Sequence, residues 1–243
     1  MKQPVRVLLV GSAGRMGQTI VDLAKGDAKI DIVALCDQGD ALEPAISHSD
    51  VVLDFSHASA LEEICRAASK YKQPLVIGTT GHSGSHRQTL NKCAKVLPIV
   101  LATNFSVGVN TLFWLTKNAA EMLGPEFDLE IVETHHRMKK DSPSGTAKTL
   151  VEILQNARKI DKVRHGREGD VGKRPADEIA VHSIRGGDVV GDHTVLFAGP
   201  GERLELIHRA SSRETFGKGA LRAAQWVVGK PPGFYSMQDV LGL

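Results

Sequence analysis

The first hundred residues alternate between short apolar runs and segments whose apolar residues recur at helical spacing. Val5–Val10 is a continuous apolar run that ends at Gly11, which is typical of a strand buried on both faces in a parallel sheet. Because strand–helix–strand units pack helices onto both faces of one sheet, the alternation predicts an α/β fold with a doubly wound, parallel, Rossmann-type sheet. Further apolar runs lie at 30–36, 51–55, 75–77 and 99–102, and helical spacing is found at 16–25, 58–72 and 86–95.

The pattern changes after Asn104. Longer alternating segments, separated by glycine- or proline-containing turns, have the pattern of antiparallel strands and predict a second, α+β domain built on a mixed sheet. The glycine- and charge-rich stretch 165–175 predicts a loop, and residues 229–243 predict a Pro-Pro turn with a short tail. The strand candidates are 127–133, 178–184, 192–198 and 203–209, and the helix candidates are 110–123, 146–157 and 219–228.

Composition narrows the classes of function. The 243 residues carry a formal net charge of +2, which argues against a nucleic-acid partner. The three isolated cysteines favour a reducing compartment and buried thiols rather than disulfides. The apolar run at the N-terminus is too short for a signal peptide, and no run approaches the roughly 18 apolar residues of a membrane span. We therefore expect a cytoplasmic protein without a membrane partner.

A glycine-rich segment follows the first predicted strand and opens the first predicted helix. Small residues there allow a tight turn and a close approach of a dinucleotide pyrophosphate to a helix N-terminus. The spacing departs from G-x-G-x-x-G because Ala13 stands where the second glycine usually falls. The alternative is a glycine turn in an α/β fold that binds no nucleotide. The expected cofactor contacts in this segment are Gly11, Ser12, Ala13, Gly14, Arg15 and Met16.

Asp37 stands at the end of the second predicted strand, 20 residues after Gly17. A carboxylate at this position can accept both ribose hydroxyls of an adenosine and would repel a 2′-phosphate. Gln38 follows it in place of an arginine, so the pair favours NADH over NADPH, although Asp37 could also be an ordinary turn residue. Two further strand ends would open on the same edge of the sheet and form walls for a nicotinamide, or be structural turns. They supply Gly78, Thr79 and Thr80, and Ala102, Thr103, Asn104 and Phe105.

The segment from His135 to Thr146 places five potentially cationic side chains in six positions and then enters a predicted helix. Ser142 and Pro143 have the pattern of an N-cap and a first helical residue. The amides near Gly145 and Thr146 would then point outward at the positive end of the helix dipole, which suits a carboxylate or phosphate. The alternative for a charge run alone is a solvated basic loop.

His135 and His136 cannot both face one pocket if the strand stays extended, because successive side chains alternate faces. Lys139 lies in the loop, where its ammonium can pair with a carboxylate or donate a proton. Each histidine could instead be a hydrogen-bonded structural residue. We expect no metal site, because adjacent histidines rarely chelate one ion and no third ligand is in view. A serine nucleophile is also disfavoured, because no G-x-S-x-G elbow occurs.

Together these motifs resemble those of the 4-hydroxy-tetrahydrodipicolinate reductases, also called dihydrodipicolinate reductases, and the similarity runs almost from end to end. The block from His135 to Thr146 is far more specific than the glycine loop. Two departures are Gln38, where many members carry an arginine, and a shorter chain between Cys36 and Asp54. The resembling segments are 10–17, 78–81, 104–108, 133–139, 141–147, 185–193 and 211–213.

The resemblance implies a nicotinamide-dependent reduction of a cyclic, imine-containing dicarboxylate to tetrahydrodipicolinate in diaminopimelate and lysine synthesis. It implies that His135 donates or accepts a proton, that Lys139 donates one, and that His136, Gly145 and Thr146 bind substrate. It also implies a dinucleotide-binding domain at 1–106 to which 214–243 returns, a substrate-binding and oligomerisation domain at 107–213, and a homotetramer. Alternatives are another two-domain reductase, such as an amino-acid or semialdehyde dehydrogenase, and a non-catalytic NAD-binding sensor.

Overall fold

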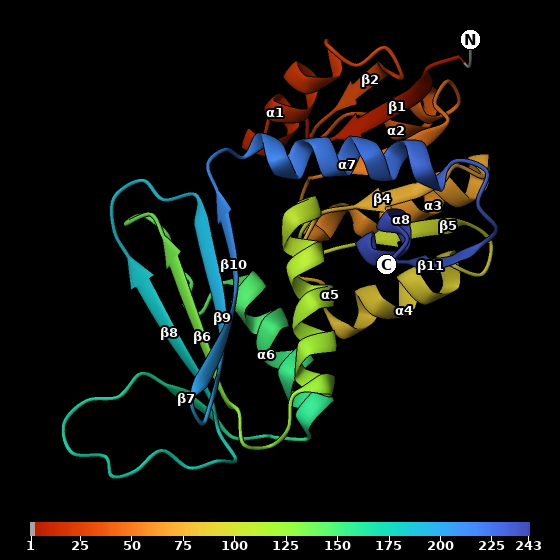
Figure 1. The fold of residues 1–243 in the computed structure, drawn as a ribbon. Coiled ribbons are helices and arrows are strands. Elements are labelled where there is room, and N and C mark those ends of the chain that lie inside the picture. Colours follow the sequence, from red (N-terminus) through yellow and green to blue (C-terminus); the bar gives the residue numbers. More distant parts are fainter. Residues whose placement is uncertain (1–2) are drawn as a thin grey trace. The chain divides into compact units, whose positions relative to one another are not determined.

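The computed structural model describes residues 3–243, which form two compact units (Figure 1). The first unit takes the chain up to residue 107 and residues 213–243, and the second takes residues 108–212. The chain therefore leaves the first unit once and returns to it.

The first unit is built on a six-stranded sheet in which every pairing is parallel. The strand order β11-β5-β4-β3-β1-β2 places β2 on one side of β1 and the later strands on the other. The direction of winding therefore reverses between β1 and β3, which is where ligands bind in open α/β sheets. The strands are β1 (Val5–Val10), β2 (Ile30–Cys36), β3 (Val51–Asp54), β4 (Leu75–Ile77), β5 (Pro98–Leu101) and β11 (Gly233–Tyr235).

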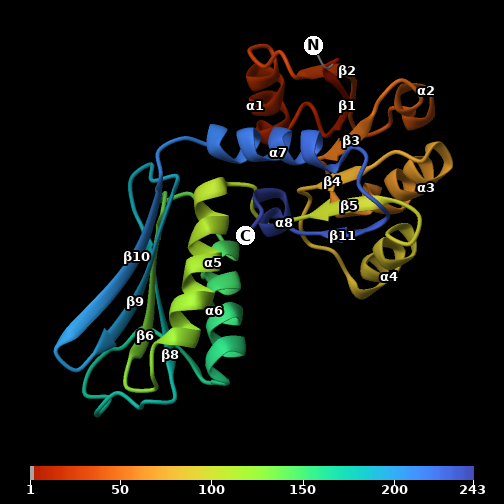
Figure 2. The same cartoon turned by 45° about the vertical axis from the view of Figure 1, so that its right-hand side comes forward.

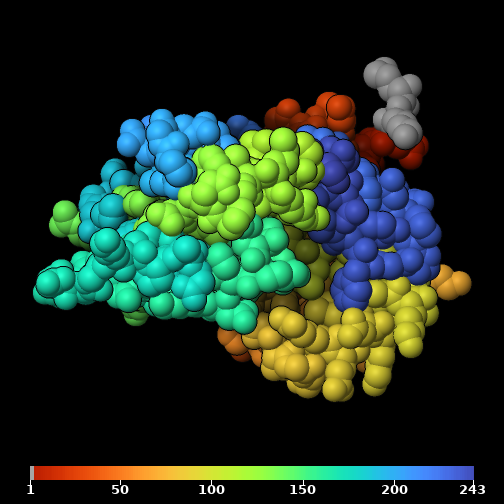
Figure 3. All heavy atoms as spheres, turned by 60° about the horizontal axis from the view of Figure 1, so that its bottom comes forward, coloured from red at the N-terminus to blue at the C-terminus, as the bar shows by residue number. Residues whose placement is uncertain are grey.

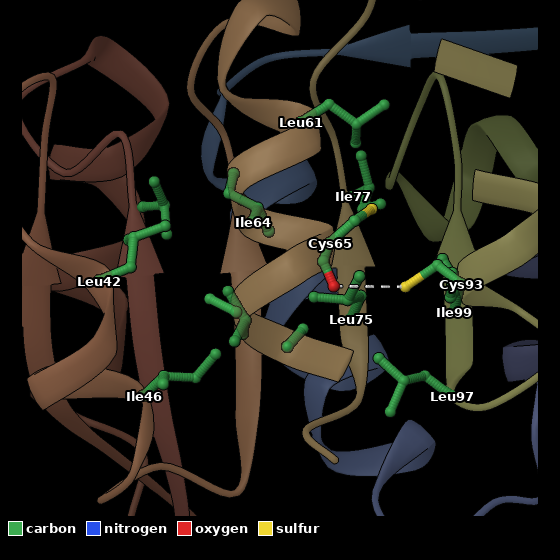
Figure 4. Close-up of a cluster of buried hydrophobic side chains, with 14 of the residues drawn as sticks. Leu42, Ile46, Leu61, Ile64, Cys65, Leu75, Ile77, Cys93, Leu97 and Ile99 are labelled. Carbon is green, nitrogen blue, oxygen red and sulfur yellow. Dashed lines mark hydrogen bonds between the residues drawn. The ribbon is translucent and has the colours of Figure 1, made fainter. Parts of the chain in front are cut away.

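Helices cover both faces of this sheet. On one face α1 and α7 pack with Ile20 and Ala224 against Val7 and Leu9 of β1, and on the other Leu61 and its helical neighbours form a second core (Figure 4). Burial on both faces explains why the central strands have continuous apolar sequences. The helices are α1 (Arg15–Ala24), α2 (Leu42–Ile46), η1 (Ala58–Ala60), α3 (Leu61–Tyr71), α4 (Gly84–Cys93), α7 (Glu214–Val227) and α8 (Met237–Leu241).

The C-terminal segment differs from the predicted turn and tail. Residues 233–235 form β11, which extends the sheet beside β5, and α8 buries Met237 and Val240 in the core shared with α7. In Figure 3 this blue segment lies directly against the yellow part of the same unit. A three-residue strand and a five-residue helix are too short to produce a clear periodic pattern, which is why the sequence did not indicate them.

The second unit contains a five-stranded mixed sheet with the order β10-β9-β6-β8-β7. The β10–β9 and β9–β6 pairings are antiparallel, whereas β6–β8 and β8–β7 are parallel, so the sheet is less antiparallel than its strand patterns suggested. A short strand, β7, which the sequence did not indicate, lies before the predicted loop and takes in its first residue, His165. The strands are β6 (Asp128–His135), β7 (Val163–His165), β8 (Ile179–Arg185), β9 (Gly191–Gly199) and β10 (Glu202–Ala210).

Helices α5 (Val107–Met122) and α6 (Gly145–Arg158) lie on one face of this sheet (Figure 2). Their apolar sides, including Leu112 and Leu150, pack on Ile131 of β6 and Phe197 of β9. Because α6 contacts both β6 and β8, it is the crossover that allows these two strands to run parallel.

The predicted N-cap of α6 was wrong by two residues. The cap is Ser144, whose hydroxyl accepts the amide of Ala147 at 3.1 Å, and the helix begins at Gly145 rather than at Pro143. The Ser144 amide itself donates to the buried carboxylate of Glu133 at 3.1 Å. A tertiary contact therefore selects between two serines that flank one proline, and local sequence does not reveal it.

The predicted fold class is confirmed: a doubly wound parallel sheet is followed by a unit with a mixed sheet. Within residues 3–243, every helix is too short or too polar to cross a bilayer.

Candidate active site

The glycine loop connects β1 to α1 at the edge where the winding of the first sheet reverses. Gly11 has φ +85°, and a Cβ there would lie 2.4 Å from the carbonyl oxygen of Phe55, so only glycine fits. Gly14 is the N-cap of α1 and offers no side chain to the first-turn amides. The start of α1, at Arg15 and Met16, therefore presents backbone donors and a positive dipole end to this edge.

Asp37, directly after β2, reaches across to this loop. Its carboxylate accepts the Ser12 hydroxyl at 2.5 Å and the Ala13 amide at 3.0 and 3.1 Å. A carboxylate has about four lone-pair sites, so acceptor capacity remains for further donors. The first and second strand ends are thus held together around one acidic group.

A cavity of about 560 Å³ opens beside Asp37. Three carboxylates line it, those of Asp37, Asp40 and Glu63, and the residues that line it include one histidine, His57, but no lysine or arginine. Gln38, Gly39 and Leu42 form part of its wall. The cavity therefore has an acidic lining.

The loops after β4 and β5 open on the same edge of the sheet, because both strands run parallel to β1 and β3. They line a larger cavity of about 730 Å³, into which Thr79, Thr80, Ala102 and Thr103 contribute. Phe105 does not line it: its ring is 2% exposed and packs 5.5 Å from the ring of Phe55. Gly78 comes directly after β4, and Asn104 accepts the Ser106 amide at 2.8 Å, which fixes the turn after β5.

In the second unit, His135 is the last residue of β6 and is 8% exposed. Its Nδ1 lies 2.5 Å from a carboxylate oxygen of Glu133, two residues earlier on the same face of the strand. Arg185, its register partner on β8, donates to both oxygens of Glu133 at 2.8 Å. The imidazole therefore rests on a buried, bidentate carboxylate–guanidinium pair.

His193 of β9 completes this cluster. It is the antiparallel partner of Glu133, its Nε2 lies 3.1 Å from the Ser144 hydroxyl, and its ring meets that of His135 edge to face at 5.1 Å. Burial, followed by the nearby charge of His135, lowers the pKa of His193 to about 3. His193 is therefore neutral at physiological pH.

The loop after β6 carries the remaining predicted side chains. His136 lies beyond the strand end, and its amide donates to the carbonyl of Val189 at 2.7 Å. The Lys139 ammonium pairs with Asp141 at 2.8 Å and is largely shielded, with 21% of its side chain exposed. The Asp141 carboxylate, 55% exposed, has its pKa lowered, first by the hydrogen bond from Lys139.

Gly145 and Thr146 form the first turn of α6 immediately after this loop. Gly145 is exposed, and nothing lies within 4 Å of the position where its Cβ would be. The helix start therefore has open space in front of its backbone. Within the second unit, His135 ends β6, Lys139 lies in the following loop, and Ser144 caps the start of α6. Ser144 connects these elements, because its amide donates to Glu133 of β6 and its hydroxyl contacts His193 of β9.

Comparison with known proteins identifies the family. A model for the N-terminus of dihydrodipicolinate reductase matches residues 5–105, and a model for its C-terminus matches residues 108–241. The chain belongs to the dihydrodipicolinate reductase family. The resemblance indicated by the sequence motifs is thereby confirmed.

Relatives match the chain over nearly its full length. The 4-hydroxy-tetrahydrodipicolinate reductase of Akkermansia muciniphila is 53% identical over 98% of both chains, and that of Aquifex aeolicus is 44% identical over 98% of this chain and 99% of its own. Among solved structures, a dipicolinate-bound dihydrodipicolinate reductase from Paenisporosarcina sp. TG-14 matches with a TM-score of 0.81 at 25% identity, covering 97% of this chain and 98% of that one. The diaminopimelate dehydrogenase of C. glutamicum shares the fold, with a TM-score of 0.56 at 14% identity.

Sequence reasoning assigned no role to Glu133, Arg185, Ser144 or His193, although all four lie in segments resembling the dihydrodipicolinate reductase family. One signal was available: residues i and i+2 of a strand share a face, so Glu133 and His135 had to be neighbours. Arg185 and His193 come from β8 and β9, and their placement depends on strand register, which the sequence does not specify. Within residues 3–243, no three His, Cys, Asp or Glu side chains are grouped to hold a metal ion.

Proposed function

We propose that this chain catalyses the NAD(P)H-dependent reduction of 4-hydroxy-tetrahydrodipicolinate to tetrahydrodipicolinate, in the synthesis of diaminopimelate and lysine. The observation that carries the proposal is a sequence identity of up to 53%, over nearly the full length of both chains, with relatives named for this activity. A related structure with dipicolinate bound supports a small dicarboxylate as the substrate class.

The residues at the edge of the first sheet fit a nicotinamide dinucleotide. The pyrophosphate would lie on the glycine loop, at Gly11 to Met16, where a Cβ at position 11 has no room and the α1 amides are uncapped. Asp37 would accept the adenosine ribose hydroxyls, and the loops at 78–80 and 102–105 would flank the nicotinamide. Phe105 would contribute through its backbone, because its ring is buried in the core.

NADH is the expected cofactor. A 2′-phosphate beside Asp37 would enter a cavity lined by Asp40 and Glu63 as well, and Gln38 supplies no compensating positive charge. Like charges at close range are strongly disfavoured in a partly enclosed site. The acidic lining therefore supports a preference for NADH over NADPH.

The second unit would supply the proton and the anion-binding groups. The bound nicotinamide supplies a hydride, and a conjugated or imine double bond then needs a proton at its other atom. His135 and Lys139 are the proton donors in this proposal. His136, Gly145 and Thr146 would bind a carboxylate at the start of α6, where the open backbone and the helix dipole favour negative charge. A substrate carboxylate would compete with Asp141 for the Lys139 ammonium.

A thioester-forming semialdehyde dehydrogenase is the weaker alternative. That reaction needs an accessible cysteine thiolate. Cys36, Cys65 and Cys93 are all buried in the first unit, and burial raises the pKa of the Cys36 thiol. The cytoplasmic location and the homotetramer remain part of this proposal.

The test is to supply the product of condensing pyruvate with aspartate semialdehyde and to follow the nicotinamide absorbance with NADH and NADPH separately. We expect oxidation of both cofactors, with the larger kcat/KM for NADH. Folded protein that oxidises neither cofactor would contradict the proposed activity, and a larger kcat/KM for NADPH would contradict only the cofactor preference.

A further inference from the structure

Glu133 is a fully buried residue on β6, the central strand of the second sheet, two residues before that strand ends. It receives hydrogen bonds from His135 at the end of its own strand, and from two other parts of the unit: Arg185 on β8 and the amide of Ser144 before α6. Removing one partner of a buried ion pair leaves an uncompensated charge and is strongly destabilising, whereas well-packed apolar residues could fill the same space. Packing alone therefore does not explain a carboxylate at this position.

The carboxylate is held in its ionised form. Burial opposes ionisation, but the hydrogen bonds from His135 and Arg185, with those of Ser183 and Ser144, outweigh it and bring the pKa of Glu133 well below its usual range. The same pair raises the pKa of Arg185, chiefly through its hydrogen bonds to Glu133. A fixed negative charge therefore faces Nδ1 of His135.

We propose that Glu133 is a positioning residue, which fixes the tautomer and the orientation of the His135 imidazole for the reaction. An ionised carboxylate can only accept, so the proton between the two groups is carried on Nδ1, and Nε2 is left as the nitrogen that exchanges a proton with substrate. Among the described residues the hydrogen bond of the His135 ring is made by Nδ1, which leaves Nε2 available, in keeping with this assignment. The inference rests on the proposed function, because it gives that role to His135.

A glycine keeps this nitrogen clear. Gly191, at the start of β9, lies beside the ring, and a Cβ there would come within 3.0 Å of Nε2 and 3.4 Å of Cδ2. A side chain at this position would press on the imidazole edge that the proposal makes reactive. The strand that carries His193 therefore also leaves space for Nε2.

The charges around His135 support the same division of roles. Glu133 on its own strand forms an ion pair with Arg185 on β8, and Lys139 and Asp141 form a second pair in the following loop. His193 on β9 is neutral, because burial and the proximity of His135 hold its pKa near 3. The imidazole of His135 is therefore the group in this cluster whose orientation the Glu133 carboxylate fixes through a direct hydrogen bond.

The experiment compares Glu133→Gln with Glu178→Gln in the full-length protein. Both residues are fully buried glutamates bound by arginines in the same unit, but Glu178 pairs with Arg164 and Arg167 and touches none of the His135 cluster. In Glu133→Gln we expect kcat to fall by between about 10-fold and 10⁴-fold, with little change in the KM for the cofactor. Glu178→Gln is expected to change stability and to leave kcat and its pH profile unchanged.

Nitrogen NMR of the His135 side chain reads the tautomer directly. We expect Nδ1–H in the neutral ring of the wild type, loss of that fixed state in Glu133→Gln, and its recovery, with part of kcat, in Glu133→Asp. An Nε2–H tautomer in the wild type overturns the proposal even if Glu133→Gln does not fold. Wild-type kcat in a folded Glu133→Gln also overturns it. If the wild type shows the Nδ1–H tautomer but no reductase activity, the proposed function fails instead.

Discussion

At the scale of single residues, the candidate chemistry was only partly visible in the sequence. The basic block indicated an anion site at a helix start, and the family resemblance implied the roles of His135 and Lys139 in proton transfer. The sequence did not indicate that Lys139 is paired with Asp141, or that His135 rests on Glu133. Partners two residues apart can be found from strand periodicity, whereas partners on other strands need the register.

Replacing Lys139 with alanine removes an ammonium that we expect to protonate the substrate. Turnover should fall by at least about 10²–10⁴-fold, the usual contribution of a general acid, while the affinity for NADH hardly changes. Steady-state kinetics together with NADH titration measure both quantities. Lys140→Ala is the matched control, because Lys140 is an exposed neighbour. Unaltered turnover in Lys139→Ala would remove this residue from the mechanism.

Asp37→Ala tests the ribose contact. The variant loses an acceptor for the ribose hydroxyls and a charge that repels a 2′-phosphate, so NADH should bind more weakly and NADPH should gain relative to it. The ratio of kcat/KM for the two cofactors is the measurement. Asp22→Ala removes the same charge at an exposed position on α1 and should leave the ratio unchanged. An unchanged ratio in Asp37→Ala would mean that the ribose is held elsewhere.

At the scale of elements, the buried parallel strands of the first sheet were predictable because their sequences are continuously apolar. The mixed pairing in the second unit was not, since β6 and β8 are parallel only because α6 connects them from one face. The start of α6 shows the same limit: Glu133 of β6 takes the Ser144 amide and so determines which serine is the cap. Helix capping here depends on the neighbouring sheet.

The buried imidazole of His193, where β9 meets the start of α6, makes the stability of the protein depend on pH. Burial keeps the pKa of His193 near 3 in the folded protein, against 6.5 ordinarily, so the unfolded chain takes up a proton between these values while the folded one does not. Stability therefore falls as the pH drops below 6.5, by about 2 kcal/mol at pH 5 for this group. Glu133 does not enter this window, because a lowered carboxyl pKa reduces stability only below its ordinary value of 4.5.

Urea unfolding at pH 7 and pH 5 measures the part of the free energy of unfolding that depends on His193. The wild type should lose about 2 kcal/mol more than His193→Gln between the two pH values, because glutamine does not titrate. The same loss in both proteins would show that His193 is not the group responsible.

At the scale of the whole molecule, the chain leaves the first unit after residue 107 and returns at residue 213. The returning segment is structural as well as connecting: α7 covers one face of the first sheet, and β11 and α8 complete its edge and core. The sequence showed the long helix but not the two short elements after it. Elements of three to five residues are determined by what they pack against.

Met237→Ala measures how much that C-terminal segment stabilises the first unit. Its side chain is 1% exposed in the core below α7, so truncation should lower the free energy of unfolding by about 2–5 kcal/mol. Leu243→Ala, at a position that is 46% exposed, should change it by less than about 0.5 kcal/mol. Equal, small effects of both substitutions in urea unfolding would mean that α8 contributes little to the unit.

In the proposed reaction this chain transfers a hydride from a nicotinamide to a cyclic dicarboxylate. The most direct measurement uses NADH deuterated at both C4 positions with the condensation product of pyruvate and aspartate semialdehyde, followed by mass spectrometry of the product. We expect tetrahydrodipicolinate carrying one deuterium per NADH consumed. Product without deuterium, or NADH consumption without reduced product, would contradict it.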